Sequence, residues 1–504
     1  MLGLETLPAL LRDAAERFGD LPAYVEGDST TSYAELLRRV EATAASYASA
    51  GVGRGDRVVL WGPNSTDWAV AALAVSYAGG VLVPVNSRYV GPEVADVVER
   101  TRAALVVVHD GFLGRDQVRE LAEAGVSHGV VALDGAASPA LGAGDAALSS
   151  GLPEAGPDDV ADILFTSGTT GRSKGAMSAH RQTIGVARAW AELGGVQQDD
   201  RYLVVNPFFH SFGYKIGIVV GLLTGCTLYP VATFDVDTTM RLIESERITV
   251  FPGAPTLYQS LLNAPGRAAR DLSSLRLAVT GAAVVPVVLI ERMREELGID
   301  QVVTAFGMTE AVVVTMCREG DSADTVATTN GRAIPGMETR IDAQGGTAGN
   351  GQTGELLVRG DYVMLGYLDD PEATREAIDE DGWLHTGDVG SLDEHGNLRI
   401  TDRLKDMYIS GGFNVYPAEV EQALARLDGV ADVAVVGVPD ERMGEVGRAY
   451  VVRAADATLT EDDVLAFARE RLANFKVPRQ VAFTDALPRN LSGKVLKTEL
   501  RDGT

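Results

Sequence analysis

Short runs of valine, leucine and isoleucine alternate with longer amphipathic stretches through the first part of the chain. The runs Arg57–Trp61 and Val81–Val85, for example, flank a helical pattern that begins at Asp67. Similar apolar runs recur as far as Phe306. Such alternation is typical of strand–helix–strand crossovers in parallel sheets that helices cover on both faces. We therefore predict an α/β fold with helix-covered, mostly parallel sheets, in which most of these strands are core.

The pattern changes at about Ile334, where glycine-rich turns begin to separate shorter strands, as in residues 343–360. This texture indicates a small antiparallel or barrel-like subdomain.

A third pattern fills the last part of the chain, where short strands alternate with two amphipathic helices. One helical pattern carries Val420 and Leu424 on the same face, and the other starts at Thr460. We predict a large N-terminal domain over residues 1–403 and a small α+β domain over residues 404–504.

The composition narrows the class of protein. With 504 residues, 46% of them hydrophobic and 23% charged, the chain is long enough for a large globular core. Its formal net charge of −26 argues against nucleic acid or an anionic membrane surface as the main partner. Cys226 and Cys317 are the only cysteines, too few for a disulfide framework or a cysteine-rich metal site, and a reducing cytoplasm fits.

No segment predicts export or membrane insertion. The amino terminus reads as an amphipathic helix and lacks the basic start and cleavage region of a signal peptide. The most apolar stretch, Ile216–Ala232, is interrupted by Gly221, Gly225 and Pro230. We therefore expect no stable membrane insertion.

Residues Thr166–Gly175, with the sequence TSGTTGRSKG, directly follow the apolar run Ile163–Phe165. Glycines let backbone N–H groups approach an anion closely, the hydroxyls add donors, and Lys174 adds positive charge. The stretch predicts a phosphate-binding loop, but not one of the Walker type, since its lysine precedes the last glycine. The alternative for such a loop alone is a flexible surface turn.

Four further strings accompany this loop. They are TAFGMTEA (Thr304–Ala311), LHTGD (Leu384–Asp388), TDRLKDMYISGGFNVYPAEVE (Thr401–Glu421) and LPRNLSGK (Leu487–Lys494). In this order the strings closely resemble the adenylate-forming superfamily of acyl-CoA synthetases, luciferases and peptide-synthetase adenylation domains, and the resemblance covers nearly the whole chain. The stretch NPFFHSFGYK and the third string are similar to actinobacterial ligases that activate the propanoate side chain of the bicyclic steroid-ring remnant (HIP-CoA ligases).

The resemblance implies an acid–CoA ligase that uses ATP, Mg²⁺ and coenzyme A. A carboxylate and ATP would form an acyl adenylate and pyrophosphate, and coenzyme A would then displace AMP. Cations and oriented N–H donors would offset the charge that builds on the phosphorus. The partners implied are a small-molecule carboxylic acid, ATP and CoA, and a homodimer is left open.

Most of the implied ATP-binding residues belong to the first two strings. The phosphate loop would act through Thr166, Ser167, Gly168, Thr169, Thr170, Gly171 and Lys174. Gly281, Ala282 and Ala283 would line the adenine, with Phe306 stacking near the base, and Gly307 would also bind ATP. Thr309 would contact phosphate, and Glu310 with Thr166 would hold Mg²⁺, which prefers oxygen ligands. Taken alone, Glu310 reads as an ordinary helix-start carboxylate.

The residues that would bind the ribose, the catalytic lysine and the hinge belong to the later strings. Asp388 would bind the ribose hydroxyls with help from Arg403, although a turn cap and a solvated charge are the alternatives. Lys494 would bridge carboxylate and α-phosphate, whereas Lys497 is interpreted as a solvated surface lysine. Lys405 would be the hinge of a mobile small domain.

The coenzyme would be bound by Ser410, Gly411, Gly412 and Phe413, for which a tight turn without a moving part is the alternative. The acyl pocket would contain Phe209, His210, Phe212 and Tyr214, with Phe208 beside them. His210 would act at the carboxylate together with the predicted catalytic residues Lys494, Glu310 and Thr166, although a lone histidine among phenylalanines is often a core residue. Lys215 would meet a substrate carbonyl or reach solvent, and solvent is favoured.

Three functional classes are open at this point. The first is an acid–CoA ligase, whose substrate is a steroid-derived bicyclic propanoate or, alternatively, a medium-chain fatty or aromatic acid. The second is an adenylating enzyme that passes its acyl group elsewhere, to a carrier protein (an acyl-AMP ligase) or to oxidation. The third is an inactive nucleotide-binding scaffold, which the joint presence of Lys174, Glu310, Asp388, Arg403 and Lys494 opposes.

Overall fold

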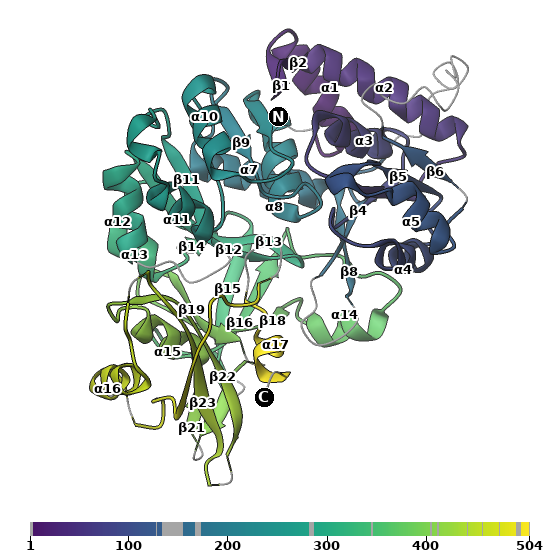
Figure 1. The fold of residues 1–504 in the computed structure, drawn as a ribbon. Coiled ribbons are helices and arrows are strands. Elements are labelled where there is room, and N and C mark those ends of the chain that lie inside the picture. The colour runs from purple at the N-terminus through teal and green to yellow at the C-terminus, as the bar shows by residue number, and fades with distance from the viewer. Residues whose placement is uncertain are drawn as a thin grey trace.

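The computed structural model describes most of the chain: residues 4–127, 129–133, 155–166, 173–281, 287–343, 346–403, 406–410, 413–440, 442–455, 457–472, 474–489 and 495–502. Figure 1 shows its helices and strands in several layers, with the last part of the chain, in yellow-green, at the lower end of the view.

A seven-stranded sheet contains β7 and β8, the two strands that flank the predicted phosphate loop in the sequence, and its order is β17-β8-β7-β4-β3-β5-β6. The strands are β3 (Arg57–Trp61), β4 (Val81–Val85), β5 (Leu105–Val108), β6 (Val130–Ala132), β7 (Val160–Phe165), β8 (Gly175–Ala179) and β17 (Gly366–Tyr367). Strands β3 to β7 are parallel, whereas β8 and β17 add antiparallel strands at one edge.

Two four-stranded sheets, β2-β1-β10-β9 and β11-β12-β13-β14, are joined by isolated bridges from Val250 to Tyr202 and Leu277. Their strands are β1 (Pro22–Glu26), β2 (Ser29–Ser32), β9 (Arg201–Val204), β10 (Thr227–Pro230), β11 (Leu277–Gly281), β12 (Gln301–Met308), β13 (Ala311–Met316) and β14 (Arg332–Ala333). Parallel and antiparallel pairs both occur here, so these sheets are mixed.

Helices surround the sheets of this part of the chain, and Figure 1 shows α3 and α4 on opposite sides of the seven-stranded sheet. They are α1 (Leu7–Phe18), α2 (Tyr33–Ser49), α3 (Thr66–Tyr77), α4 (Gly91–Thr101), α5 (Gln117–Glu123), α7 (His180–Gly194), α8 (Ser211–Gly213), α9 (Val220–Thr224), α10 (Val236–Glu246), α11 (Pro255–Asn263), α12 (Val287–Glu296), α13 (Ala323–Thr328) and α14 (Pro371–Ala377). A π-helix, Tyr214–Val219, links α8 to α9, and short 3₁₀ turns lie at Phe112–Gly114 and Arg267–Ala269.

Local sequence explains several of these helices. Helix α1 begins after Thr6, whose hydroxyl accepts from the Ala9 N–H, and buries Leu7, Leu10 and Leu11 as the amphipathic pattern predicts. Helix α3 is apolar around its circumference, and nearly all of its residues are buried between neighbouring elements.

The predicted antiparallel subdomain is the sheet β15-β16-β18-β19. Its strands are β15 (Met337–Asp342), β16 (Gly354–Gly360), β18 (Leu384–Leu392) and β19 (Leu398–Arg403), and all pairs are antiparallel.

The last part of the chain has its own sheet and its own hydrophobic clusters. The strands are β20 (Tyr408–Ser410), β21 (Phe413–Val415), β22 (Val430–Asp440), β23 (Gly444–Arg453) and β24 (Gln480–Phe483), with helices α15 (Pro417–Leu424), α16 (Glu461–Arg471) and α17 (Lys497–Asp502). Thr460 caps α16 reciprocally with Asp463, and Val420 and Leu424 of α15 are buried.

The predicted fold class is confirmed, whereas the division into domains at residues 403 and 404 stays a prediction. The apolar stretch Ile216–Ala232 forms the π-helix, α9 and β10 rather than one long helix. Within the described part of the chain, no helix combines the length and apolar character that crossing a bilayer requires.

Candidate active site

The predicted phosphate loop is closed at its neck by two hydrogen bonds. The Thr166 N–H donates to the Lys174 carbonyl at 2.8 Å, and the Lys174 N–H donates to Thr166 Oγ1 at 3.2 Å. Strands β7 and β8 enter and leave the loop as a hairpin. A Cβ at Gly175 would lie 2.8 Å from Ile163 Cγ2, so a larger residue there would push the hairpin apart. Residues 167–172, which include Ser167, Gly168, Thr169, Thr170 and Gly171, lie outside the described part of the chain.

Glu310 occupies the tight turn between β12 and β13, so its interpretation as a helix-start carboxylate is wrong. Antiparallel strands on both sides hold this turn, and Met308 pairs with Ala311 across it. Thr309 is the other residue of the turn. A Cβ at Gly307 would lie 1.9 Å from the Val312 carbonyl oxygen, so this position admits only glycine without rearrangement.

Tyr367 of β17 joins the turn to the phosphate loop. Its hydroxyl donates to Glu310 Oε1 at 2.8 Å, and the Lys174 Nζ lies 5.0 Å from the centre of its ring. Burial and the neighbouring Glu310 carboxylate raise the pKa of Tyr367. The hydroxyl therefore stays protonated and acts as the donor in this hydrogen bond. Two charged groups of opposite sign from distant parts of the chain therefore meet at one aromatic side chain.

The adenine candidates lie at adjacent strand ends. Gly281 ends β11 and pairs with Ala305, next to Phe306 on β12. A Cβ at Gly281 would come within 2.7 Å of the Ala305 carbonyl oxygen, which explains glycine there. Ala282 and Ala283 fall outside the described residues.

Asp388 and Arg403 are register partners across the antiparallel strands β18 and β19. Asp388 is buried within β18, so its interpretation as a turn cap is wrong. The Asp388 N–H donates to Thr386 Oγ1 at 3.0 Å, which in turn donates to the Leu356 carbonyl at 2.7 Å. Arg403 is the last residue of β19.

His210 begins α8, and its Nδ1 accepts a hydrogen bond from the Phe212 N–H at 3.1 Å. The side chain is solvent-accessible, yet the surrounding protein desolvates it and lowers its pKa. A neutral imidazole whose Nδ1 accepts carries its proton on Nε2. His210 can therefore offer an N–H donor to an anion in the space beside it. Phe209 and Phe212 are partly exposed next to it.

Tyr214 belongs to the core rather than to an open acyl pocket. It is completely buried, and its ring centre lies 6.4 Å from that of Trp68. Phe208 is likewise buried and packs on Trp68 at 5.3 Å. Tyr214 is the first residue of the π-helix, all six residues of which are buried.

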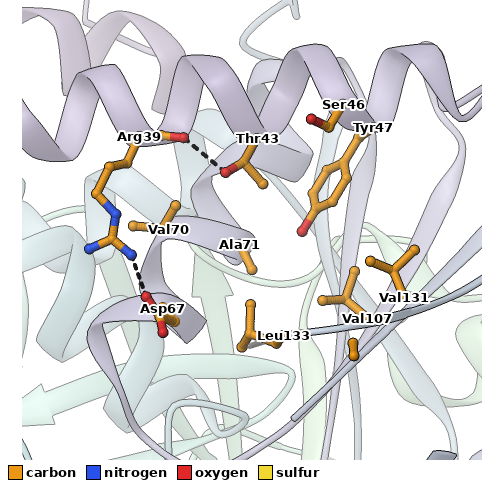
Figure 2. Close-up of a pocket in the computed structure, with 11 residues that line it drawn as sticks. Arg39, Thr43, Ser46, Tyr47, Asp67, Val70, Ala71, Val107, Val131 and Leu133 are labelled. Atoms are coloured by element: carbon orange, nitrogen blue, oxygen red, sulfur yellow. Dashed lines mark hydrogen bonds and ion pairs between the residues drawn. The ribbon is translucent and has the colours of Figure 1, made fainter. Parts of the chain in front are cut away.

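Two cavities elsewhere in the described structure contain none of the predicted site residues. The first, about 20 Å³, lies between α2, α3, β5 and the edge strand β6 (Figure 2). It is lined mainly by apolar side chains, with the Arg39–Asp67 ion pair at one side, and has room for about one water molecule. The second, about 330 Å³, is lined by Arg54, Arg57 and His180 among others.

The family is decided by matches over most of the chain. Residues 11–368 match the model of the AMP-binding enzyme family, and residues 419–494 match that of the AMP-binding enzyme C-terminal domain. The chain belongs to the AMP-binding enzyme family.

Curated relatives of this AMP-binding enzyme include two named 3-[(3aS,4S,7aS)-7a-methyl-1,5-dioxo-octahydro-1H-inden-4-yl]propanoyl:CoA ligase. The one from Rhodococcus jostii is 56% identical and covers 99% of this chain and 98% of its own. The one from Mycobacterium tuberculosis is 53% identical and covers 99% of both chains. The crystal structure of ATP-bound MatB from Rhodopseudomonas palustris has a TM-score of 0.89 at 32% identity and covers 99% of both chains. The predicted superfamily and the enzyme class, an adenylate-forming acyl-CoA ligase, are confirmed.

Several predicted residues of the AMP-binding enzyme are not placed by the structure. Lys405, Gly411, Gly412 and Lys494 lie outside the described residues, as do the side chains of Arg403 and Phe413. Ser410 is described, and it is buried at the end of β20. Lys497 is not a solvated lysine, because its Nζ lies 2.9 Å from Glu421 Oε1 and its side chain is largely buried.

Sequence reasoning missed two groups of residues in this AMP-binding enzyme. Tyr367 gave no signal in the sequence beyond its position after Gly366. Lys215 is 1% exposed and pairs with Asp162, which is 0% exposed, so neither solvent nor a substrate carbonyl is its partner. Asp162 could have been noticed, since it is a lone carboxylate inside the apolar run of β7.

Proposed function

We propose that this AMP-binding enzyme is an ATP-dependent ligase that joins a bicyclic, steroid-derived propanoate to coenzyme A. The names and the 56% and 53% identity of the two actinobacterial relatives support the substrate class. The meeting of Lys174 and Glu310 at Tyr367 supports the chemistry, because it gathers a cation and a metal-binding carboxylate where a triphosphate would lie.

The first step is adenylation. A carboxylate oxygen of the acid attacks the α-phosphorus of ATP, the bond to the bridging oxygen breaks, and pyrophosphate leaves. Lys174 and the loop N–H groups would neutralise the departing phosphates, and Lys494 would hold the acid against the α-phosphate. The His210 Nε2 proton would orient the acid carboxylate.

The donor set fits Mg²⁺, which keeps several waters and takes one or two carboxylates plus phosphate oxygens rather than a protein cage. Glu310, with the Thr166 hydroxyl, would hold it. When bound, the ion adds positive charge between phosphate oxygens. The absence of any cluster of three or more carboxylate, histidine or cysteine ligands among the described residues agrees with such a shared site.

The second step is thioester formation. The coenzyme A sulfur attacks the acyl carbon, the thiol proton is lost, and AMP leaves. We propose that residues 404–504 rotate about Lys405 between the two steps, withdrawing Lys494 and bringing Ser410–Phe413 to the acyl adenylate. Both cysteines are buried and unpaired, which supports a reducing cytoplasm as the location. A homodimer stays a prediction.

The test is a substrate panel with ATP and free CoA. Bicyclic propanoates, medium-chain fatty acids and aromatic acids are compared by release of pyrophosphate, AMP and acyl-CoA. We expect the highest kcat/KM for the bicyclic propanoate, with equal amounts of AMP and acyl-CoA. Pyrophosphate release without acyl-CoA would indicate a carrier-loading enzyme instead, and no pyrophosphate with any acid would indicate an inactive scaffold.

A further inference from the structure

Residues 363–368 connect the Glu310 turn to the phosphate hairpin through backbone hydrogen bonds. The Met364 N–H donates to the Glu310 carbonyl at 2.8 Å. At the other end the Leu368 N–H donates to the Gly175 carbonyl at 2.8 Å, so the segment runs along the strand that leaves the phosphate loop. The segment therefore ties the two halves of the triphosphate site together independently of any side chain.

The backbone of Tyr367 is also held by helix α14. Its N–H donates to Thr374 Oγ1 at 2.9 Å, and Thr374 belongs to helix α14. The preceding residue, Gly366, has a φ of +141° and lies close to Thr374. A Cβ at Gly366 would come within 2.9 Å of the Thr374 side chain. These contacts fix the backbone of Tyr367, and its side chain lies against Lys174 and Glu310.

The two charged groups do not pair with each other. Lys174 and Glu310 form no ion pair, although each contacts Tyr367. The hydroxyl of Tyr367 engages Glu310 Oε1, and Oε2 has no hydrogen-bond partner among the residues that the structure describes. The ring meanwhile lies against the lysine ammonium at a distance typical of a cation–π contact.

We propose that Tyr367 is a positioning residue for the metal-bound nucleotide. It holds the Glu310 carboxylate through one oxygen and leaves the other oxygen available to the metal, and its ring lies against Lys174 and prevents an ion pair between Lys174 and that carboxylate. The inference rests on the proposed function, because it assumes that Lys174 and Glu310 serve ATP and its Mg²⁺. Tyr367 itself forms no bond to the reacting atoms.

Two substitutions separate the parts of this role. Tyr367→Phe removes only the hydroxyl, so Glu310 loses its anchor while Lys174 keeps the ring. Tyr367→Leu removes both contacts and allows Lys174 and Glu310 to pair. Tyr362→Phe is the matched control, since Tyr362 lies just before the same segment and its hydroxyl has no hydrogen-bond partner within the described structure.

The readout is equilibrium binding, measured by calorimetry with Mg·ATP, with ATP in EDTA, and with AMP. We expect Tyr367→Phe to weaken Mg·ATP binding about tenfold, the size of one hydrogen bond to a charged group, and to leave metal-free ATP unchanged. Tyr367→Leu should weaken the binding of both Mg·ATP and metal-free ATP. AMP binding and the melting temperature should stay at the wild-type values in Tyr367→Phe, and Tyr362→Phe should match the wild type throughout.

Mg·ATP binding by Tyr367→Phe that equals or exceeds that of the wild type would overturn the role of Tyr367. So would equal weakening of Mg·ATP and AMP, because that pattern indicates general damage to the fold. The proposed function fails separately, if the wild-type enzyme binds Mg·ATP but releases no pyrophosphate with the acid panel.

Discussion

The Nζ of Lys215 lies 2.9 Å from Oδ1 of Asp162, and neither side chain has more than 1% of its surface exposed. Ser178 Oγ accepts a second hydrogen bond from the ammonium at 2.8 Å, and Thr183 donates to the other carboxylate oxygen at 2.7 Å. The pair joins the π-helix that follows His210 to the phosphate hairpin, so it links the two sides of the proposed acid and ATP site.

Removal of one member of this pair should destabilise the protein strongly. Lys215→Met leaves the Asp162 carboxylate buried without its cation, and Asp162→Asn leaves the ammonium without its anion. We expect either change to cost about 3–5 kcal/mol, measured by denaturant unfolding of the purified enzyme. The double variant should be more stable than the sum of the two losses predicts. Losses below about 1 kcal/mol would show that the buried pair contributes nothing specific.

His180 should make the enzyme sensitive to acid. It is buried at the start of α7, where its Nδ1 accepts from the Leu7 N–H at 3.3 Å, and burial lowers its pKa from 6.5 to about 4. Between these two values the unfolded chain takes up a proton that the folded protein refuses, so stability falls as the pH drops from 6.5 to 4 and the loss ends below 4.

Over this pH range, the titration of His180 lowers the free energy of unfolding by roughly 3 kcal/mol. This loss is measured as the difference between wild type and His180→Asn, whose amide oxygen can still accept from Leu7 but does not titrate. Between pH 6.5 and 4 the free energy of unfolding of the wild type should fall by roughly 3 kcal/mol relative to that of His180→Asn. Parallel profiles between pH 6.5 and 4 would contradict the assignment.

Asp388 should serve the nucleoside rather than the phosphates. We expect Asp388→Ala to weaken AMP and ATP binding alike, by about tenfold to a hundredfold, because both ligands carry the ribose hydroxyls that it would bind. Glu310→Gln is the matched comparison, since it should weaken the binding of Mg·ATP and leave the binding of AMP unchanged. Calorimetry with both nucleotides distinguishes the two, and an Asp388→Ala enzyme with normal AMP affinity would refute the ribose assignment.

Lys494 should act in only one of the two steps. Lys494→Ala is expected to lose adenylation by about a hundredfold or more, the scale seen when one charge-stabilising donor is removed. Thioester formation from supplied acyl adenylate should continue at the wild-type rate, and rapid-quench measurement of each half-reaction checks this. Equal rate losses in both half-reactions would contradict the prediction that Lys494 acts only in adenylation.

Local sequence determined the α/β class, the alternation of strands and helices along the chain, and the family. Alternation between apolar runs and amphipathic helices reports which faces are buried, and that information is local. The motif strings were likewise readable because each lies within a few consecutive residues, such as the loop that ends at Gly175. Even a helix cap as small as that of Thr460 could be located in this way.

The tertiary structure alone decided which of these residues meet. Lys174 and Glu310 are far apart in the chain, and they converge only because β17 pairs with β8 and so carries Tyr367 between them. Tyr214 and Lys215 likewise lie only two and three residues after the partly exposed Phe212, yet both are buried in the π-helix. A buried lysine is stable only opposite a buried anion, and its partner, Asp162, comes from another part of the chain. Local periodicity cannot specify such a pairing, because it depends on the register of strands and helices that contact one another only in the folded protein.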